Sequence, residues 1–244
     1  MVEEIIYTSA EKGLKSGSRG FCTVVSTAGM GLNLAERLEA MSGYRHVFPL
    51  NDPNAKLNPV NYAHVTFRLA GRKLNVISRV ADAGQDYTGR SNKLAHHVVI
   101  NNPVVMTVGP ARLLAESGTV VNKWDGSVRN VPPRTIASPA LPKSVVLKIW
   151  NSQVGDGGWA GAIAEMLLQD PSPVSVIFRP GMDTLGLVRE VLDVLPLCRN
   201  AGTLHLVRTS RDCWRGLNVS YDLYWTERLR QPRCAITPRL ALSI

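Results

Sequence analysis

The sequence predicts an α+β protein, with a mainly antiparallel β domain carrying short helices in its N-terminal part and a small α/β unit after it. In the first half, short runs of alternating apolar and polar residues are separated by glycine-containing turns, a pattern typical of antiparallel strands. After a proline-rich stretch, apolar β runs alternate with helical patterns, as in parallel strands joined by crossover helices.

The first predicted elements are two strands and a helix. Residues 4–10 begin with an apolar pair and Tyr7, and a glycine-containing loop leads into the β-branched run 21–26, which indicates strand, loop and strand. Residues 33–41 are expected to form a short helix. Asn33 and Glu36 have the spacing of a capping box, and Gly43 stands just past the end.

A β-hairpin is the clearest element of the first half. Residues 65–69 alternate between apolar and polar side chains, and the run 74–80 is again apolar after a turn at Gly71. A strand over residues 95–100 follows. A helix then begins at Pro110, a residue suited to the first helical turn, and ends before Gly118.

Residues 131–143 contain four prolines, which no regular element tolerates. We therefore expect a linker there, between an N-terminal domain over residues 1–130 and an α/β domain over residues 144–244. The chain ends on an apolar stretch, so the second domain is expected to be truncated from a longer polypeptide.

The second half predicts alternating helices and strands. Helices are expected over residues 159–168 and 184–197, and strands over residues 174–178 and 204–207. The second helix carries a broad apolar stripe, as a crossover between parallel strands requires. Asp183 or Thr184 is expected to cap that helix.

Composition limits the classes of protein to consider. The chain has 244 residues, 45% of them hydrophobic, which is ample for a packed core. It lacks an apolar run of membrane-spanning length and a secretion signal at its start, so we expect a cytoplasmic protein without membrane association. The four cysteines are scattered, which favours reduced thiols over disulfides or a metal site.

The net charge of +9 is concentrated near the end of the chain, where residues 199–239 hold eight arginines against three carboxylates. Such a basic segment suits either nucleic acid or an acidic protein. Stacking aromatics do not alternate with the arginines, so we favour a protein partner and do not expect nucleic-acid binding.

The richest polar cluster lies in residues 86–101, directly before and within an apolar β run. It offers five candidate binding residues: Tyr87, Thr88, Arg90, His96 and His97. The cluster suits either a loop that positions a ligand or a polar network that joins two hairpins. The two histidines are adjacent, so on a strand they point to opposite faces and cannot serve one reactive centre. Anchoring of neighbouring backbone is the commoner role of such residues.

Two further candidates lie elsewhere. The loop 11–20 combines glycines with Lys12, Lys15 and Arg19, which suits a phosphate or a hairpin loop, but it lacks the signature of a nucleotide P-loop. Arg215 is expected to form a salt bridge within the second domain. A serine-hydrolase elbow is absent, and Cys22 lies inside an apolar β run, which argues for burial of its thiol.

Several blocks together resemble one family. They are Ile5-Ile6-Tyr7-Thr8-Ser9-Ala10 with Gly13-Leu14, Tyr87-Thr88-Gly89-Arg90 leading to Ala95-His96-His97, the helix around Trp159, Leu195-Pro196 before the strand 203–207, and Cys213-Trp214-Arg215-Gly216. These blocks are similar to the N-terminal and middle domains of bacterial GTPase-associated adaptor proteins. The strand containing Leu206-Val207-Arg208-Thr209 departs from the aromatic-rich strand of that family.

The resemblance implies a non-enzymatic adaptor that binds a GTPase-like protein in an NTP-dependent conflict or defence system, together with further effector domains of that system. The absence of a nucleophile, metal or nucleotide motif also favours an adaptor without a cofactor. The alternative is a small hydrolase or a ligand sensor that uses Arg90, His96 and His97. A pocket lined by these residues, with a carboxylate or thiol within hydrogen-bond reach, would distinguish the two.

Overall fold

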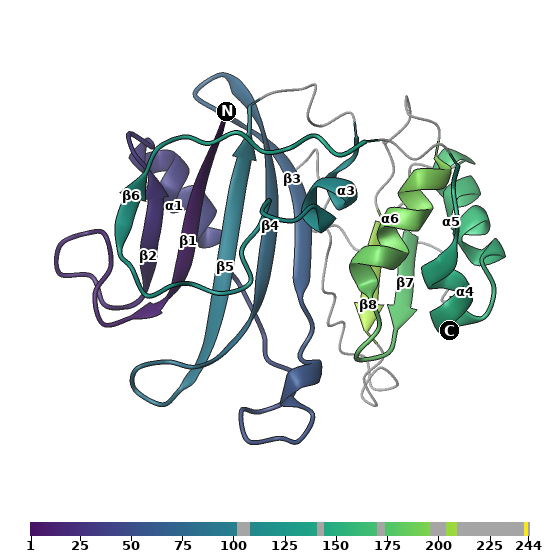
Figure 1. The fold of residues 1–244 in the computed structure, drawn as a ribbon, viewed down its shortest axis with the longest axis horizontal. Coiled ribbons are helices and arrows are strands. Elements are labelled where there is room, and N and C mark those ends of the chain that lie inside the picture. Colours follow the sequence, from purple (N-terminus) through teal and green to yellow (C-terminus); the bar gives the residue numbers. More distant parts are fainter. Residues whose placement is uncertain (102–107, 141–143, 170–173, 196–203, 209–241, 244) are drawn as a thin grey trace, which may run out of the picture.

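A computed structural model describes residues 1–101, 108–140, 144–169, 174–195, 204–208 and 242–243. Figure 1 shows a larger, mainly antiparallel sheet in the first half of the chain and a small parallel sheet with helices in the second. This arrangement confirms the predicted α+β class, with an N-terminal β part followed by a small α/β unit.

The larger sheet has six strands in the order β3-β4-β5-β1-β2-β6. Neighbouring strands are antiparallel, except that β6 runs parallel to β2. The strands are β1 (Val2–Ala10), β2 (Gly20–Thr27), β3 (Asn61–Leu69), β4 (Arg72–Gln85), β5 (Ser91–Ile100) and β6 (Arg129–Val131). The predicted hairpin is β3 and β4, and the strand that follows it is β5, at the centre of the sheet.

Both faces of this sheet are covered near β5. On one face, Leu34 and Leu38 of α1 (Leu32–Ala40) pack with Ile5 and Val99. The other face is covered by a cluster that draws on α3 (Pro110–Ala115) and on the segment after it: Leu113, Leu114 and Ile136. Residues 94–100 of β5 are therefore all buried, which explains why their sequence is a continuous apolar run with two histidines and not an alternating one.

Within the described residues of the second half there are three helices and a parallel sheet of order β8-β7-β9. Helix α6 joins β7 to β8, the crossover that its apolar stripe predicts. Asp183 caps α6 by accepting a hydrogen bond of 2.9 Å from the amide of Gly186. The elements are α4 (Lys148–Val154), α5 (Gly158–Gln169), β7 (Val174–Phe178), α6 (Thr184–Val194), β8 (Leu204–Arg208) and β9 (Leu242–Ser243).

Helix α4 is held by a buried carboxylate. Glu190 of α6 accepts hydrogen bonds from the amides of Ile149 (2.8 Å) and Trp150 (3.1 Å), two of the amides that have no partner within a helix's first turn. The indole of Trp150 donates to the carbonyl of Leu187 at 2.9 Å. Sequence analysis missed α4, because its start carries no capping residue of its own.

Two expectations differ in detail from the structure, and a third group cannot be compared with it. The capping box was wrong: α1 begins at Leu32 after Gly31, no side chain caps it, and Asn33 lies within its first turn. The second-half helix ends at Val194 and not at residue 197. Cys198, Cys213, Cys234, Arg215 and most of the basic segment 199–239 lie outside the described residues.

The start of the proline-rich stretch belongs to the first sheet. Val131 ends β6, Val2 donates from its amide to the carbonyl of Arg134 at 2.8 Å, and Ile136 is buried. The two halves also touch, since Arg112 of α3 binds Asp193 of α6 with two contacts of 2.6 and 2.8 Å. The division into domains at residues 131–143 stays a prediction.

Limited proteolysis tests this division. We expect the first cuts to fall between Ile136, which is anchored in the core, and Lys148, where α4 begins, since Val145 and Val146 are exposed. The N-terminal fragment should stay folded, as measured by circular dichroism after purification. First cuts inside the β1–β2 loop, or equal resistance along the chain, would contradict the two-domain interpretation.

Candidate functional site

The candidate site surrounds β5, where polar side chains are buried on both faces of the sheet. Such groups must find hydrogen-bond partners inside the protein, because burial without partners is costly. The buried polar residues of this region are Thr8, Ser9, Thr27, Ser42, Ser78, Asp86, Asn92, His96 and His97. Their bonds fall into three networks: one at the β4–β5 turn and one on each face.

Asp86 organises the turn between β4 and β5. Its carboxylate accepts hydrogen bonds from the amide and hydroxyl of Thr88 (2.8 and 2.7 Å), the amide of Arg90 (3.0 Å) and the hydroxyl of Ser9 (2.9 Å). Gly89, with φ of 81°, gives the turn its left-handed residue. The bonds from Thr88 above all, and those from Arg90 and Ser9, hold the pKa of Asp86 well below its usual range.

Arg90 and Tyr87 lie on the outside of this turn. The guanidinium of Arg90 contacts Asp86 at 3.2 Å and donates to the hydroxyl of Thr88 at 2.8 Å, yet its side chain is 68% exposed. Tyr87 is 45% exposed. Thr88 and Arg90 are thus parts of the turn, and neither contacts a histidine through a bond recorded among the described residues.

Asn92 and Ser9 join the turn to β1. The Asn92 side-chain oxygen accepts from the amide of Ser9 at 3.1 Å, and Thr8 donates from its hydroxyl to the carbonyl of Lys93 at 2.8 Å. With the bond from Ser9 to Asp86, these contacts fix the β4–β5 hairpin against β1. Sequence analysis missed Asp86, Asn92 and Ser9. The Asp-x-x-Gly spacing from Asp86 to Gly89 was the signal that could have found the turn.

His96 lies on the face covered by α3. Its Nδ1 accepts a hydrogen bond from the amide of Val121 at 3.0 Å, so the ring proton is on Nε2, which lies 3.0 Å from the carboxylate of Glu4. Both ring nitrogens are therefore engaged with the protein. The side chain is 1% exposed.

Glu4 connects His96 to the proline-rich segment. Its carboxylate accepts two bonds from Arg134, of 2.8 and 2.7 Å, and Arg134 also donates to the carbonyls of Gly118 and Thr119. Burial alone would raise the pKa of Glu4, but the hydrogen bonds from His96 and Arg134, together with the charge of Arg134, lower it to about 2. The ion pair thus holds the segment 118–134 against the sheet.

His97 lies on the opposite face, as predicted for adjacent strand residues. Its Nδ1 is 2.7 Å from the hydroxyl of Ser78 and its Nε2 is 2.9 Å from that of Ser42, which itself donates to the carbonyl of Leu38. Ser42 therefore accepts from Nε2, and Ser78 donates to Nδ1. Burial above all, and also the charge of Lys93, lowers the pKa of His97 to about 3, so the ring is neutral.

Arg19 lies in the β1–β2 loop and is exposed. The loop is closed by backbone bonds from Gly13 to Ser18 (3.0 Å) and from Leu14 to Thr23 (2.9 Å). A Cβ at Gly13 would stand 2.5 Å from the Ser18 hydroxyl, so only glycine fits there. No recorded bond brings Arg19 to the β5 networks, and Arg215 lies outside the described residues.

Within the described ranges, no three His, Cys, Asp or Glu side chains are grouped so that they could hold a metal ion. Cys22 is buried, and burial raises the pKa of its thiol, which disfavours the reactive thiolate. The described helices include none long and apolar enough to cross a membrane.

Comparison with known proteins gives one family match. The family model described as GTPase-associated protein 1, N-terminal domain type 2, matches residues 1–136. The matched range contains the whole six-stranded sheet, α1, α3 and all three polar networks. No curated protein and no solved structure matches the chain.

Acidification should destabilise the fold through His97. Its pKa is about 3 in the folded protein and about 6.5 in the unfolded chain, so between these values the unfolded state binds more protons. Lowering the pH from 6.5 to 5 should remove about 2 kcal/mol of stability. His64, whose pKa burial lowers to about 4, acts in the same direction.

The measurement is the urea midpoint as a function of pH for the parent and for His97→Gln. The variant should be less stable at pH 7 and show a shallower decline between pH 6.5 and 5. The account of His97 is wrong if the parent and the variant decline equally over this range.

The β4–β5 turn should depend on Asp86 more than on Arg90. Asp86→Ala leaves the Ser9 and Thr88 hydroxyls and two amides without their acceptor, whereas Arg90→Ala removes a side chain that is mostly in solvent. Melting temperatures should therefore fall much further for Asp86→Ala. Equal falls in the two variants would show that the exposed ion pair, and not the buried carboxylate, holds the turn.

Proposed function

Since the chain belongs, over residues 1–136, to the family of GTPase-associated protein 1 N-terminal domains of type 2, we propose that it is a non-enzymatic adaptor that binds a GTPase-like protein. The family name itself associates this domain with a GTPase. The observation that carries the adaptor role is that the histidines at the candidate site bond to the protein through both ring nitrogens.

A hydrolase needs a base with one nitrogen turned toward a nucleophile or water that substrate can reach. His97 has two serine neighbours, an arrangement that in isolation suits nucleophilic catalysis. However, the side chains of His97, Ser42 and Ser78 are all at most 2% exposed, so no substrate carbonyl reaches either hydroxyl. His96 pairs with Glu4, but its second nitrogen is occupied by a backbone amide. These contacts support a structural role for the candidate site in preference to a catalytic one.

In this proposal the chain acts in a bacterial conflict or defence system. It would connect the nucleotide-dependent state of the GTPase-like protein to effector domains of the same system. Its own contribution is the six-stranded sheet, with a β1–β2 loop and a β4–β5 turn that are held by internal hydrogen bonds. The chain itself needs no cofactor for that role.

Affinity capture tests the proposal. The full chain, immobilised through a tag, is incubated with extract of the source cell in the presence of GDP or of a non-hydrolysable GTP analogue. We expect a GTP-binding protein to be enriched over a tag-only control, and the purified partner to bind the chain directly in calorimetry. Absence of any GTP-binding protein under both nucleotide conditions would contradict the adaptor role.

The hydrolase or sensor alternative makes a different prediction. Under it, Arg90→Ala and His96→Ala would melt like the parent and yet lose a measurable hydrolytic or ligand-binding activity. Under the adaptor proposal, His96→Ala lowers the melting temperature, because Glu4 and the amide of Val121 lose their partner at a cost of roughly 1–3 kcal/mol.

A further inference from the structure

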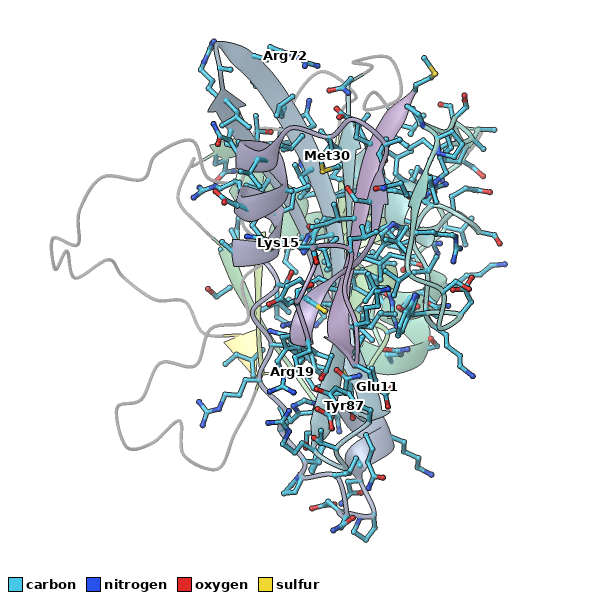
Figure 2. The ribbon with its side chains drawn as sticks, turned by 90° about the vertical axis from the view of Figure 1, so that its left-hand side faces the viewer. Glu11, Lys15, Arg19, Met30, Arg72 and Tyr87 are labelled. Atoms are coloured by element: carbon cyan, nitrogen blue, oxygen red, sulfur yellow. The ribbon has the colours of Figure 1, made fainter. Side chains whose placement is uncertain are left out.

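The β1–β2 loop and the β4–β5 turn lie side by side at one end of the larger sheet. The hydroxyl of Ser9, next to the end of β1, bonds to Asp86 at the start of the turn at 2.9 Å. In Figure 2, Glu11, Arg19 and Tyr87 are grouped at this end, and Arg72 lies at the opposite end. We call this region, with the adjoining parts of β1, β2 and β5, the loop-end surface.

Aromatic side chains are exposed on the loop-end surface. Phe21 is 46% exposed, and its ring stacks with that of Tyr7 at 6.3 Å between centroids. The ammonium of Lys93 lies 4.9 Å from the centre of the Phe21 ring and 5.8 Å from that of Tyr7. No carboxylate among the residues that the structure describes forms an ion pair with Lys93. A cation and an apolar anchor are thus presented together.

The charge of the loop-end surface is positive. Its carboxylates are Asp86, which is paired with Arg90, and Glu39 and Glu11, for which no ion pair is recorded among the described residues; Glu39 accepts a bond from Thr23. The cations without a carboxylate partner recorded among the described residues are Lys12, Lys15, Arg19 and Lys93. Cations that outnumber their internal partners favour an acidic ligand.

We propose that the loop-end surface docks an acidic segment of the partner protein that also carries an apolar or aromatic side chain. This inference rests on the proposed adaptor function, because it assigns a binding surface and a chemistry to that function. Carboxylates of the segment meet Arg19 and Lys93, and its apolar side chain packs beside Phe21 and Tyr87. Aromatic anchors next to arginine are the residues that most often dominate the energy of protein interfaces.

A single-stranded nucleic acid is the competing occupant, since it also uses cations and aromatic rings. Bases stack on free ring faces. Here Tyr7 and Phe21 stack on each other and Lys93 lies over both rings, which leaves Tyr87 as the exposed aromatic outside that stack. The geometry therefore favours a protein segment.

The first experiment uses fluorescence anisotropy with a short labelled peptide rich in Glu and Leu. Its controls are the same peptide with Lys in place of Glu, and an oligothymidine of similar length. The acidic peptide should bind the full chain, and the other two should bind at least about tenfold more weakly. Arg19→Glu and Phe21→Ser, both at exposed positions, should weaken acidic-peptide binding about tenfold.

Arg72→Glu is the matched control, because it reverses another exposed charge at the opposite end of the sheet. It should change the affinity less than about twofold. Arg19→Glu and Arg72→Glu should melt within a degree or so of the parent, since surface substitutions change stability little. Phe21→Ser also loses the ring contacts with Tyr7 and Lys93, so its affinity is measured at a temperature well below its own melting temperature. If Arg19→Glu and Arg72→Glu weaken acidic-peptide binding equally, the affinity depends only on net charge and the proposal is wrong. Tighter binding of oligothymidine than of the acidic peptide would also overturn it.

Affinity capture with the same variants separates the two proposals. If Arg19→Glu and Phe21→Ser capture a GTP-binding protein as well as the parent does, the docking surface is wrong and the adaptor function stands. If no GTP-binding protein is captured but the acidic peptide binds in the predicted way, the surface stands and the GTPase partner is wrong.

Discussion

The burial of β5 on both faces is the constraint on which the rest of this structure depends. Residues 94–100 of this central strand, covered by α1 on one side and by α3 with the segment 118–134 on the other, are all buried. Any polar side chain on it must be bonded inside the protein. His96, His97 and Asn92 are bonded in this way, and each of them joins β5 to a different element: the covering segment, the end of α1 and strand β1.

Because of this burial, residues that resemble a catalytic site in the sequence have a structural role in the folded protein. Adjacent histidines, serines and a glutamate are the usual materials of hydrolytic sites, and the distances of 2.7–3.0 Å around His96 and His97 are those of catalytic pairs. Two properties decide between a catalytic and a structural role: whether substrate can reach the ring, and whether a ring nitrogen is free to bond it. Both rings are buried, and each is hydrogen-bonded through both of its nitrogens. The exposed groups Arg19, Phe21 and Tyr87 lie on the loop-end surface, where a macromolecule can reach them.

Much of the fold could be predicted from local sequence. The hairpin of β3 and β4, the strand β7 and the cap of α6 by Asp183 follow from alternation, apolar runs and capping residues. What could not be predicted depends on distant partners. Helix α4 relies on Glu190 from another helix, β6 is a three-residue strand held by β2, and the bond between Glu4 and Arg134 joins residues far apart in the chain. For the site, the opposite orientation of the histidines was predictable, but their partners were not.

The most direct test of this account is nitrogen-15 NMR of the histidine rings. We predict that His96 and His97 both carry their proton on Nε2 with an unprotonated Nδ1, and that His97 stays neutral at pH 5. The signals should exchange slowly with solvent because both rings are buried. A His97 ring that becomes cationic near neutral pH, or a His96 ring with its proton on Nδ1 and an Nε2 free for substrate, would contradict the structural role assigned to this strand.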